Sequence, residues 1–164
     1  MVLVNARTVS MFVLAAVALG PSQVAERTVQ ASIARIFGRG AVGSHVRADS
    51  ADVFRVMRGD SLLGFAQIRE ARGKEQPITF LVAIDPVNRL KDVDILVYRE
   101  PYGGEVAYES WRRQFRGQGV DAPLVPGRDI RSISGATISV NAVTTGVRLA
   151  LRDLVRWRES GVLR

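Results

Sequence analysis

The stretch from Val53 to Tyr98 reads VFRVMRGDSLLGFAQIREARGKEQPITFLVAIDPVNRLKDVDILVY, and it decides the fold class. Its runs of β-branched and aromatic residues predict four strands, at Val53–Met57, Leu62–Glu70, Ile78–Ile84 and Leu90–Tyr98. Turn-forming residues separate these runs, namely Arg58-Gly59-Asp60 and Asp85-Pro86-Val87-Asn88. Connections this short join antiparallel but not parallel neighbours, so the stretch predicts a twisted antiparallel meander.

The segment before this sheet predicts one helix and one loop. Ala25–Phe37 carries apolar residues at offsets of four, seven and eight, which is the spacing of an amphipathic helix. Gly38–Ser50 is rich in glycine and small polar residues, and this composition predicts a loop that leads into the sheet.

After the sheet, two further helices are predicted, with Gly- and Pro-rich loops before each. The first spans Glu105–Phe115, where Trp111 and Phe115 are expected to pack in the core rather than against a cofactor. The second begins near Ser139 and continues toward Ser160, with an apolar seam formed by Val140, Val143, Val147, Leu151 and Leu154. A meander flanked by helices is an α+β fold.

The N-terminus has the build of an export signal. Arg7 precedes the apolar run Val9–Gly20, and Pro21 closes that run before several small residues. About a dozen apolar residues fall short of the roughly twenty that cross a bilayer. Residues 1–25 are therefore expected to be a signal peptide or a weak membrane anchor, with a buried core helix as the alternative, and residues 26–164 to form one domain.

Composition narrows the chemistry available to the chain. The 164 residues include no cysteine, which excludes disulfides, thiolate metal sites and iron–sulfur clusters. His45 is the single histidine and is expected at the surface, so no metal site is expected. The net charge of +7 comes mainly from arginines that are interspersed with acids along the chain, and we interpret them mainly as solvated faces. Such a surface favours contact with anionic lipid or an acidic protein. Nucleic-acid binding is less supported, because no basic run is interleaved with aromatic residues.

The segment Ser134-Gly135-Ala136-Thr137-Ile138-Ser139 lies where an extended stretch turns into the last helix. The first turn of a helix has unpaired N–H groups and a partial positive charge, which stabilise a phosphate. Gly135 permits close approach of the backbone, Ser139 is expected to cap the helix, and Thr137 is expected to direct its hydroxyl at the same anion pocket.

This SGATIS segment resembles the attachment motif of the covalent FMN-binding domain family. The family includes the flavin-bearing subunits of the sodium-pumping NADH:quinone reductase and of the Rnf electron-transport complexes. The resemblance implies that Thr137 is esterified to the phosphate of FMN by a flavin transferase, which uses FAD as the donor with a divalent metal. The alternative is that Thr137 is only a helix-capping residue.

Other segments resemble the same family, from about Thr28 to Leu151. Arg99–Gly104 (REPYGG) is similar to a family loop that usually reads Glu-Thr-Pro-Gly, and Trp111–Gly117 is similar to the end of a family helix. Two residues depart from the pattern: the loop lacks its threonine, and Arg131 stands six positions before Thr137, where an acid is usual. Arg131 is read either as a solvated strand residue or as a cation beside the phosphate.

The sequence thus predicts an exported electron carrier rather than a stand-alone enzyme, in the periplasm or on the outer face of the cytoplasmic membrane. Its expected partners are the flavin transferase and a membrane or periplasmic redox protein. A non-redox sensor or assembly module and a small flavin-dependent reductase are the alternatives. The candidate FMN-binding residues are Ser134, Gly135, Ala136, Thr137, Ile138, Ser139, Glu100, Pro101, Tyr102, Gly103, Gly104 and Arg131, and no catalytic residue is expected.

Overall fold

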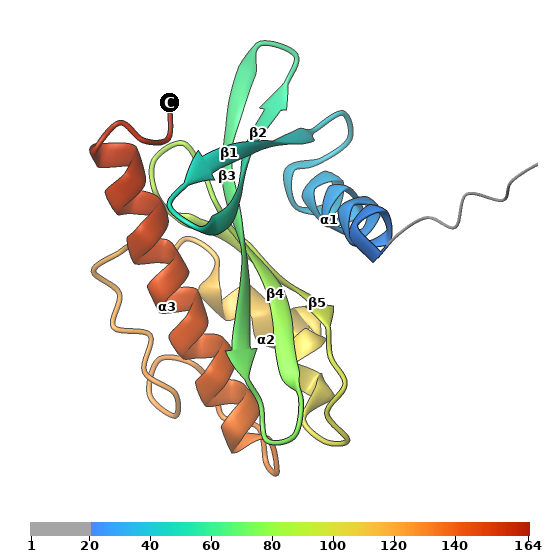
Figure 1. Ribbon diagram of the computed structural model, residues 1–164. Helices are drawn as coiled ribbons and strands as arrows, with labels where there is room; N and C mark the ends of the chain where they lie inside the picture. Colours follow the sequence, from blue (N-terminus) through green and yellow to red (C-terminus); the bar gives the residue numbers. More distant parts are fainter. Residues whose placement is uncertain (1–20) are drawn as a thin grey trace, which may run out of the picture.

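The computed structural model describes residues 21–164, and the apolar run of the expected export signal lies outside them. Figure 1 shows one antiparallel sheet with helices on both sides. In chain order the elements are α1 (Pro21–Phe37), β1 (Val42–Ala48), β2 (Ala51–Arg58), β3 (Ser61–Arg72), β4 (Pro77–Ile84), β5 (Leu90–Val97), the 3-10 helix η1 (Gly104–Ala107), α2 (Glu109–Arg112), the 3-10 helix η2 (Arg113–Phe115) and α3 (Thr137–Glu159).

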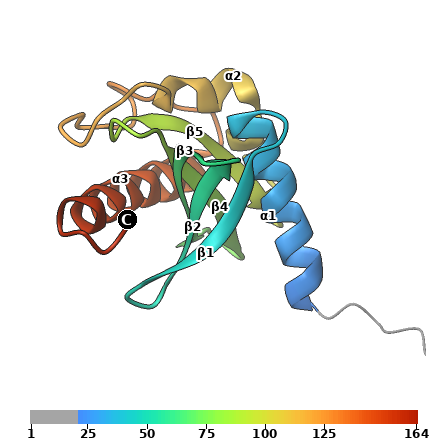
Figure 2. The same ribbon diagram turned by 90° about the horizontal axis from the view of Figure 1, so that it is seen from above.

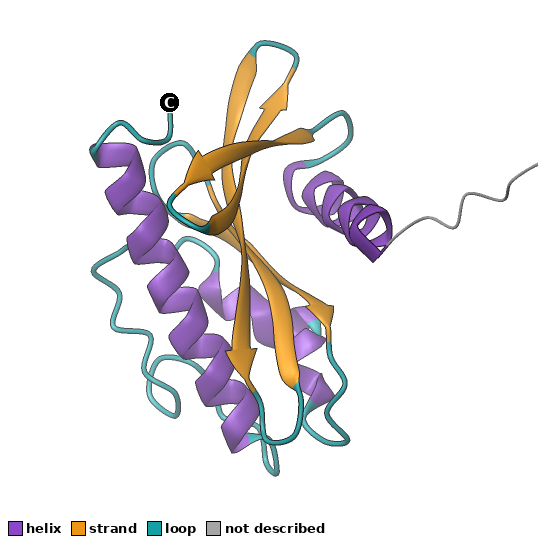
Figure 3. Ribbon diagram, in the orientation of Figure 1, coloured by secondary structure: helices purple, strands orange, loops and turns teal. Residues whose placement is uncertain are grey.

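The sheet is a simple meander in the order β1-β2-β3-β4-β5, with every neighbouring pair antiparallel (Figure 3). The α+β fold and the four predicted strands are therefore confirmed. Gly59 has a φ of 55° in the two-residue turn between β2 and β3, a conformation that glycine adopts without strain. The carboxylate of Asp85 accepts backbone N–H groups of Val87 and Arg89, which holds the predicted turn between β4 and β5.

The two faces of the sheet bury two separate apolar clusters. One cluster joins α3 and the α2 region to the sheet, and Figure 2 shows α3 and α1 on opposite sides of the strands. The whole predicted seam of α3, from Val140 to Leu154, is buried in this cluster. The other cluster holds α1 through Val29, Ile33 and Phe37. Helix α3 thus packs along the sheet over its whole seam. This packing places the N-terminus of α3 beside the β3–β4 turn.

The expectation that residues 38–50 form only a loop is wrong, because this segment contains strand β1. Gly43 lies in β1, where an added Cβ would come within 2.4 Å of Ile33 Cδ1, so a larger residue would force the end of that side chain to move. The side-chain amide of Gln30 donates to the carbonyl of Gly43 and accepts from its N–H. A helix side chain thus satisfies the backbone groups of an edge strand whose small residues carry no clear alternation.

The two later helices also differ from expectation. The predicted helix over Glu105–Phe115 is broken into η1, α2 and η2, each of which is only three or four residues long. The last helix begins at Thr137, two residues before the expected start, because the N–H of Val140 donates to the carbonyl of Ala136 at 2.9 Å. Ser139 is therefore inside the helix and is not its cap.

One arginine contradicts the view that the arginines lie on solvated faces. Arg112 is only 6% exposed, and its guanidinium lies 3.5 Å from the carboxylate of buried Asp92. The guanidinium also donates to the backbone carbonyls of Ala107 and Val93, so the buried charge is paired and hydrogen-bonded. Trp111 and Phe115 are buried beside it, as predicted for core residues.

Candidate functional site

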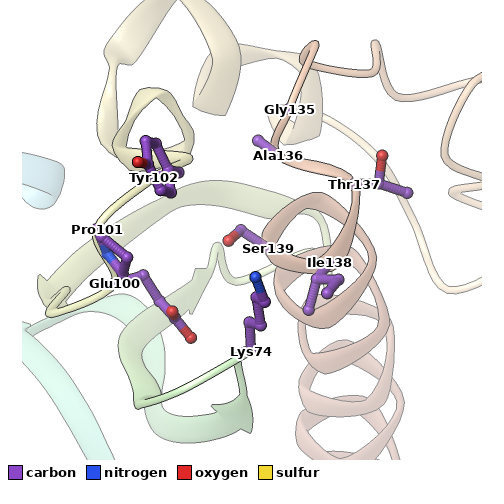
Figure 4. A pocket seen from close by; sticks show the side chains of 9 residues that line it. All are labelled: Lys74, Glu100, Pro101, Tyr102, Gly135, Ala136, Thr137, Ile138 and Ser139. Atoms are coloured by element: carbon purple, nitrogen blue, oxygen red, sulfur yellow. The ribbon is translucent and has the colours of Figure 1, made fainter.

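A pocket of about 280 Å³ lies at the N-terminus of α3 (Figure 4). Three segments far apart in the sequence form it: the β3–β4 turn, the loop after β5 and the first turn of α3. Most of the candidate FMN-binding residues meet here, although the predicted set did not include Lys74. The lining residues are Lys74, Glu100, Pro101, Tyr102, Gly135, Ala136, Thr137, Ile138 and Ser139.

The first turn of α3 supplies positive potential to this pocket. Ala136 is the N-cap residue and has no side chain that caps the helix, and no acid lies in the first turn. The amide groups at the start of a helix have no partner within the helix and carry partial positive charge. An anion is the ligand that such a helix start stabilises best.

Thr137 is the first residue of α3 and is exposed. Figure 4 shows its side chain on the far side of the first turn from Lys74 and Glu100, rather than directed into the middle of the pocket. Its hydroxyl lies at the rim, where a second protein has access to it. The adjoining Gly135 has a φ of 76°, and no atom lies within 4 Å of a Cβ built on it, so the space above this turn is open.

Ser139 lies inside the first turn of α3 and links this helix to the segment after β5. It is 5% exposed, and its hydroxyl lies 2.9 Å from the hydroxyl of Tyr98. The hydroxyl of Tyr98 also donates to the carbonyl of Tyr102. Burial raises the pKa of Tyr98 above its ordinary value of 10.0, so this hydroxyl remains protonated near neutral pH.

Gly103 packs directly against the hydrogen-bonded hydroxyls of Tyr98 and Ser139, which together form a joint between the loop after β5 and α3. Its φ is 88°, and a Cβ at this position would lie 2.8 Å from the hydroxyl of Tyr98 and 3.0 Å from Ser139 Oγ. Only glycine therefore fits between the loop and the helix without a shift. Tyr98 is a joint residue that the sequence did not predict, because nothing in its local sequence distinguishes it from any tyrosine at the end of a strand.

Glu100 holds the β3–β4 turn instead of facing the pocket freely. Its carboxylate accepts the backbone N–H of Glu75 at 2.8 Å and that of Gln76 at 3.1 Å. Position 73 is glycine, and a Cβ there would lie 2.1 Å from the Glu100 carboxylate. The hydrogen bond from Gln76 is the main reason why the pKa of Glu100 lies below its ordinary value of 4.5.

We expect Glu100→Gln to change how the stability of the protein depends on pH. A carboxyl with a lowered folded-state pKa adds stability above about pH 4.5, its ordinary value, and loses it as the pH falls through the folded-state pKa. The melting temperature of the wild type should therefore exceed that of Glu100→Gln at pH 7, and the difference should shrink below about pH 4.5. Melting curves across this range measure the effect. The control is Glu75→Gln, which removes a neighbouring charge but keeps the Glu100 carboxylate. If Glu100→Gln and Glu75→Gln have the same melting temperatures at every pH, the role of Glu100 is contradicted.

The remaining candidate residues lie outside the pocket lining. Gly103 and Gly104 form the back of the loop, and Ser134 is exposed in the turn before Gly135. Arg131 lies in neither a strand nor the pocket: its guanidinium donates to the carbonyl of Ser110 at 3.3 Å, and its own carbonyl accepts the indole N–H of Trp111. Its contact with a phosphate stays a prediction.

Two further properties bear on the site. Within residues 21–164, no group of three or more His, Cys, Asp or Glu side chains is arranged to hold a metal ion. In the same part of the chain, no helix has both the length and the apolar character needed to cross a membrane. His45 is exposed and packs against Phe54 with ring centroids 4.2 Å apart, as expected for a surface residue.

Comparisons with known proteins point to one cofactor. The family model described as "FMN-binding domain" matches residues 73–152, a range that contains every residue lining the pocket. Over 110 residues the chain is 28% identical to a subunit of the proton-translocating ferredoxin:NAD(+) oxidoreductase complex of Clostridium ljungdahlii, and the match covers 63% of this chain and 60% of that protein. The chain therefore spans about 60% of the length of that curated relative.

A solved structure supports the fold. The crystal structure of Shewanella oneidensis NqrC aligns with a TM-score of 0.55 and 18% sequence identity. The alignment covers 75% of this chain and 71% of that one. At this identity the likeness shows a shared fold, with the antiparallel sheet and the C-terminal helix in common.

Proposed function

Because residues 73–152 belong to the family of FMN-binding domains, we propose that this chain is an exported flavoprotein that carries electrons, with FMN joined through its phosphate to Thr137. The observation that carries the proposal is the exposed hydroxyl of Thr137 at the positively polarised start of α3. An exposed hydroxyl is open to a modifying enzyme, and the helix start stabilises the phosphate that the modification brings.

The residues around Thr137 fit FMN by their chemistry. The first-turn amides suit a phosphate, and the open space over Gly135 leaves room for it. Tyr102 is 78% exposed at the pocket wall and offers an aromatic face to a planar ring. Bound FMN supplies a ring system that takes up and releases electrons, which no side chain of this cysteine-free protein provides.

Attachment of the flavin follows from the accessibility of Thr137. In the proposed reaction, Thr137 Oγ1 attacks the phosphorus that belongs to the FMN half of FAD. A new P–O ester bond forms, the pyrophosphate bond breaks, AMP leaves and the hydroxyl proton is released. The flavin transferase supplies FAD and a divalent cation, so Thr137 needs no base of its own. The chain then retains the cofactor, while Tyr98 and Ser139 fix the loop beside it.

The partners and the location are part of the same proposal. The name of the Clostridium relative describes a subunit of an oxidoreductase complex, which supports a protein partner for electron transfer here. The signal-like residues 1–25 favour export to the periplasm or the outer face of the cytoplasmic membrane, with membrane association through that segment. A covalent link keeps the flavin with the protein where lost cofactor is not replaced.

The test is the intact mass of the full chain, expressed in an exporting host with and without a flavin transferase. We expect an increment equal to FMN minus water, together with yellow colour, only when the transferase is present. An unmodified, colourless protein in the presence of the transferase would contradict the proposal and favour the non-redox module. Turnover with a soluble acceptor in the absence of any protein partner would favour the reductase instead.

A further inference from the structure

Lys74 extends from the β3–β4 turn into the wall of the pocket. In Figure 4 its side chain rises from the turn toward the first turn of α3, on the side where Ser139 lies. Lys74 is exposed, and no ion pair found among residues 21–164 involves its ammonium group. The charge of Lys74 helps to lower the pKa of nearby Glu100, but the two side chains form no ion pair, so the ammonium group can still approach an occupant of the pocket.

This placement runs against the usual electrostatics of helices. Cations are stabilised near helix C-termini and are unfavourable near the positive N-terminus. Here a lysine faces a helix start that has no acid in its first turn. Glu100 is the one carboxylate in the pocket wall, and its oxygen already accepts two backbone N–H groups. Glu100 offsets part of the Lys74 charge, and an anion in the pocket would offset the remaining positive potential of the helix start.

The position of Thr137 indicates which anion Lys74 meets. The phosphate of an FMN tethered as proposed would be held at the Thr137 oxygen, which lies on the opposite side of the first turn from Lys74. The ring system of an FMN held there would be the part of the cofactor left to approach the wall that carries Lys74. A flavin ring bound there would gain one net negative charge if a reduced partner supplied two electrons and the solvent one proton. The oxidised ring is neutral, so a nearby cation favours the reduced state.

We propose that Lys74 is a positioning residue that stabilises the negatively charged reduced ring of the flavin and thereby raises the reduction potential of the protein. This inference rests on the proposed function. Glu100 supports it by clamping the turn through Glu75 and Gln76, which directs Lys74 toward α3. The role is electrostatic, so it depends on the charge of residue 74 and not on its hydrogen-bonding geometry.

The chain contains its own control, because Lys91 is the only other lysine. Lys91 lies on β5, where its ammonium group sits 5.5 Å from the ring centroid of Phe37, on the face of the sheet that α1 covers. Lys74→Met and Lys91→Met therefore remove the same charge from the protein at different distances from the pocket. Any effect of net charge alone is equal in the two variants.

The experiment is a reductive titration of the purified flavinylated protein with dithionite and a reference dye. We expect Lys74→Met to lower the ratio of reduced to oxidised flavin about tenfold at a given potential, equivalent to about 30 mV for a two-electron couple. Lys91→Met and Lys74→Arg should both stay close to the wild type. The gap between the two methionine variants should narrow at high salt, because salt screens exposed charges.

The outcomes separate this inference from the proposed function. A wild-type protein without flavin overturns the proposed function and this inference with it. Flavin present in every variant, with equal potentials for Lys74→Met and Lys91→Met, overturns this inference alone. Reduced flavin loading of Lys74→Met with an unchanged potential in its flavinylated fraction also overturns it, since Lys74 would then serve the phosphate. Lys74→Gln provides a second neutral variant if Lys74→Met folds poorly.

Discussion

Thr137→Ala is expected to abolish covalent flavin attachment completely. The variant lacks the only oxygen that the side chain of residue 137 can offer to a phosphoester, whereas its backbone can still begin α3, because the N-cap Ala136 uses no side chain. The fold should therefore persist while the cofactor is lost. Intact mass after expression with a flavin transferase measures the result, and the increment of FMN minus water should disappear.

Two further variants provide the controls for this prediction. Ser134→Ala removes an exposed hydroxyl three residues away, and it should keep the full mass increment. Thr137→Ser retains an oxygen at the attachment position and should keep at least part of it. If the increment persists in Thr137→Ala and is lost in Ser134→Ala, the tether lies at Ser134 and the assignment to Thr137 is wrong.

Gly103→Ala is expected to destabilise the flavin-free protein by about 2–5 kcal/mol. A left-handed backbone conformation costs a non-glycine residue about 1–2 kcal/mol. The added methyl group would also press on the hydroxyls of Tyr98 and Ser139, and overpacking of this kind costs about 1–3 kcal/mol more. A loss of this size is a large fraction of the roughly 5–15 kcal/mol that stabilises a typical domain.

Gly135→Ala is the matched control for Gly103→Ala. Gly135 also has a positive φ, of 76° against 88° for Gly103, but a Cβ on it meets no atom within 4 Å. This variant should therefore lose only the conformational part, about 1–2 kcal/mol. Urea unfolding of both variants gives the two free energies. If the two variants lose the same free energy of unfolding, the contacts of Gly103 with Tyr98 and Ser139 adjust to a methyl group at little cost, and they do not fix the loop on α3.

The sequence predicted most of the fold because the relevant signals are local. Turn residues such as Gly59 and Asp85 act within a few positions, and the seam from Val140 to Leu154 follows from helical periodicity alone. Strand β1 was missed for the complementary reason. Its small and polar residues show no period of two, and it is held by pairing with β2 and by the side chain of Gln30.

The pocket was predicted in part. Residues of the SGATIS segment and of the loop from Glu100 to Tyr102 were predicted to bind FMN, and Gly135 to Ser139 and Glu100 to Tyr102 line the pocket. Lys74 was not expected there. Glu100 was predicted as an FMN-binding residue, and the structure adds that its carboxylate accepts backbone N–H groups of the β3–β4 turn. Such contacts depend on which turn lies at the end of α3, and no local pattern encodes this.

The sequence by itself determined the antiparallel meander, the long last helix and the position of the SGATIS segment where that helix begins, because propensity, periodicity and turn chemistry operate over short stretches of chain. Only the tertiary structure decided that Ser139 pairs with Tyr98, that Glu100 clamps the turn carrying Lys74, and that Arg112 is buried beside Asp92. Ser139 and Tyr98 lie 41 residues apart in the chain, Glu100 and Gln76 of the turn lie 24 apart, and Arg112 and Asp92 lie 20 apart. They meet because burial of the sheet against α3 and the α2 region fixes where each segment ends.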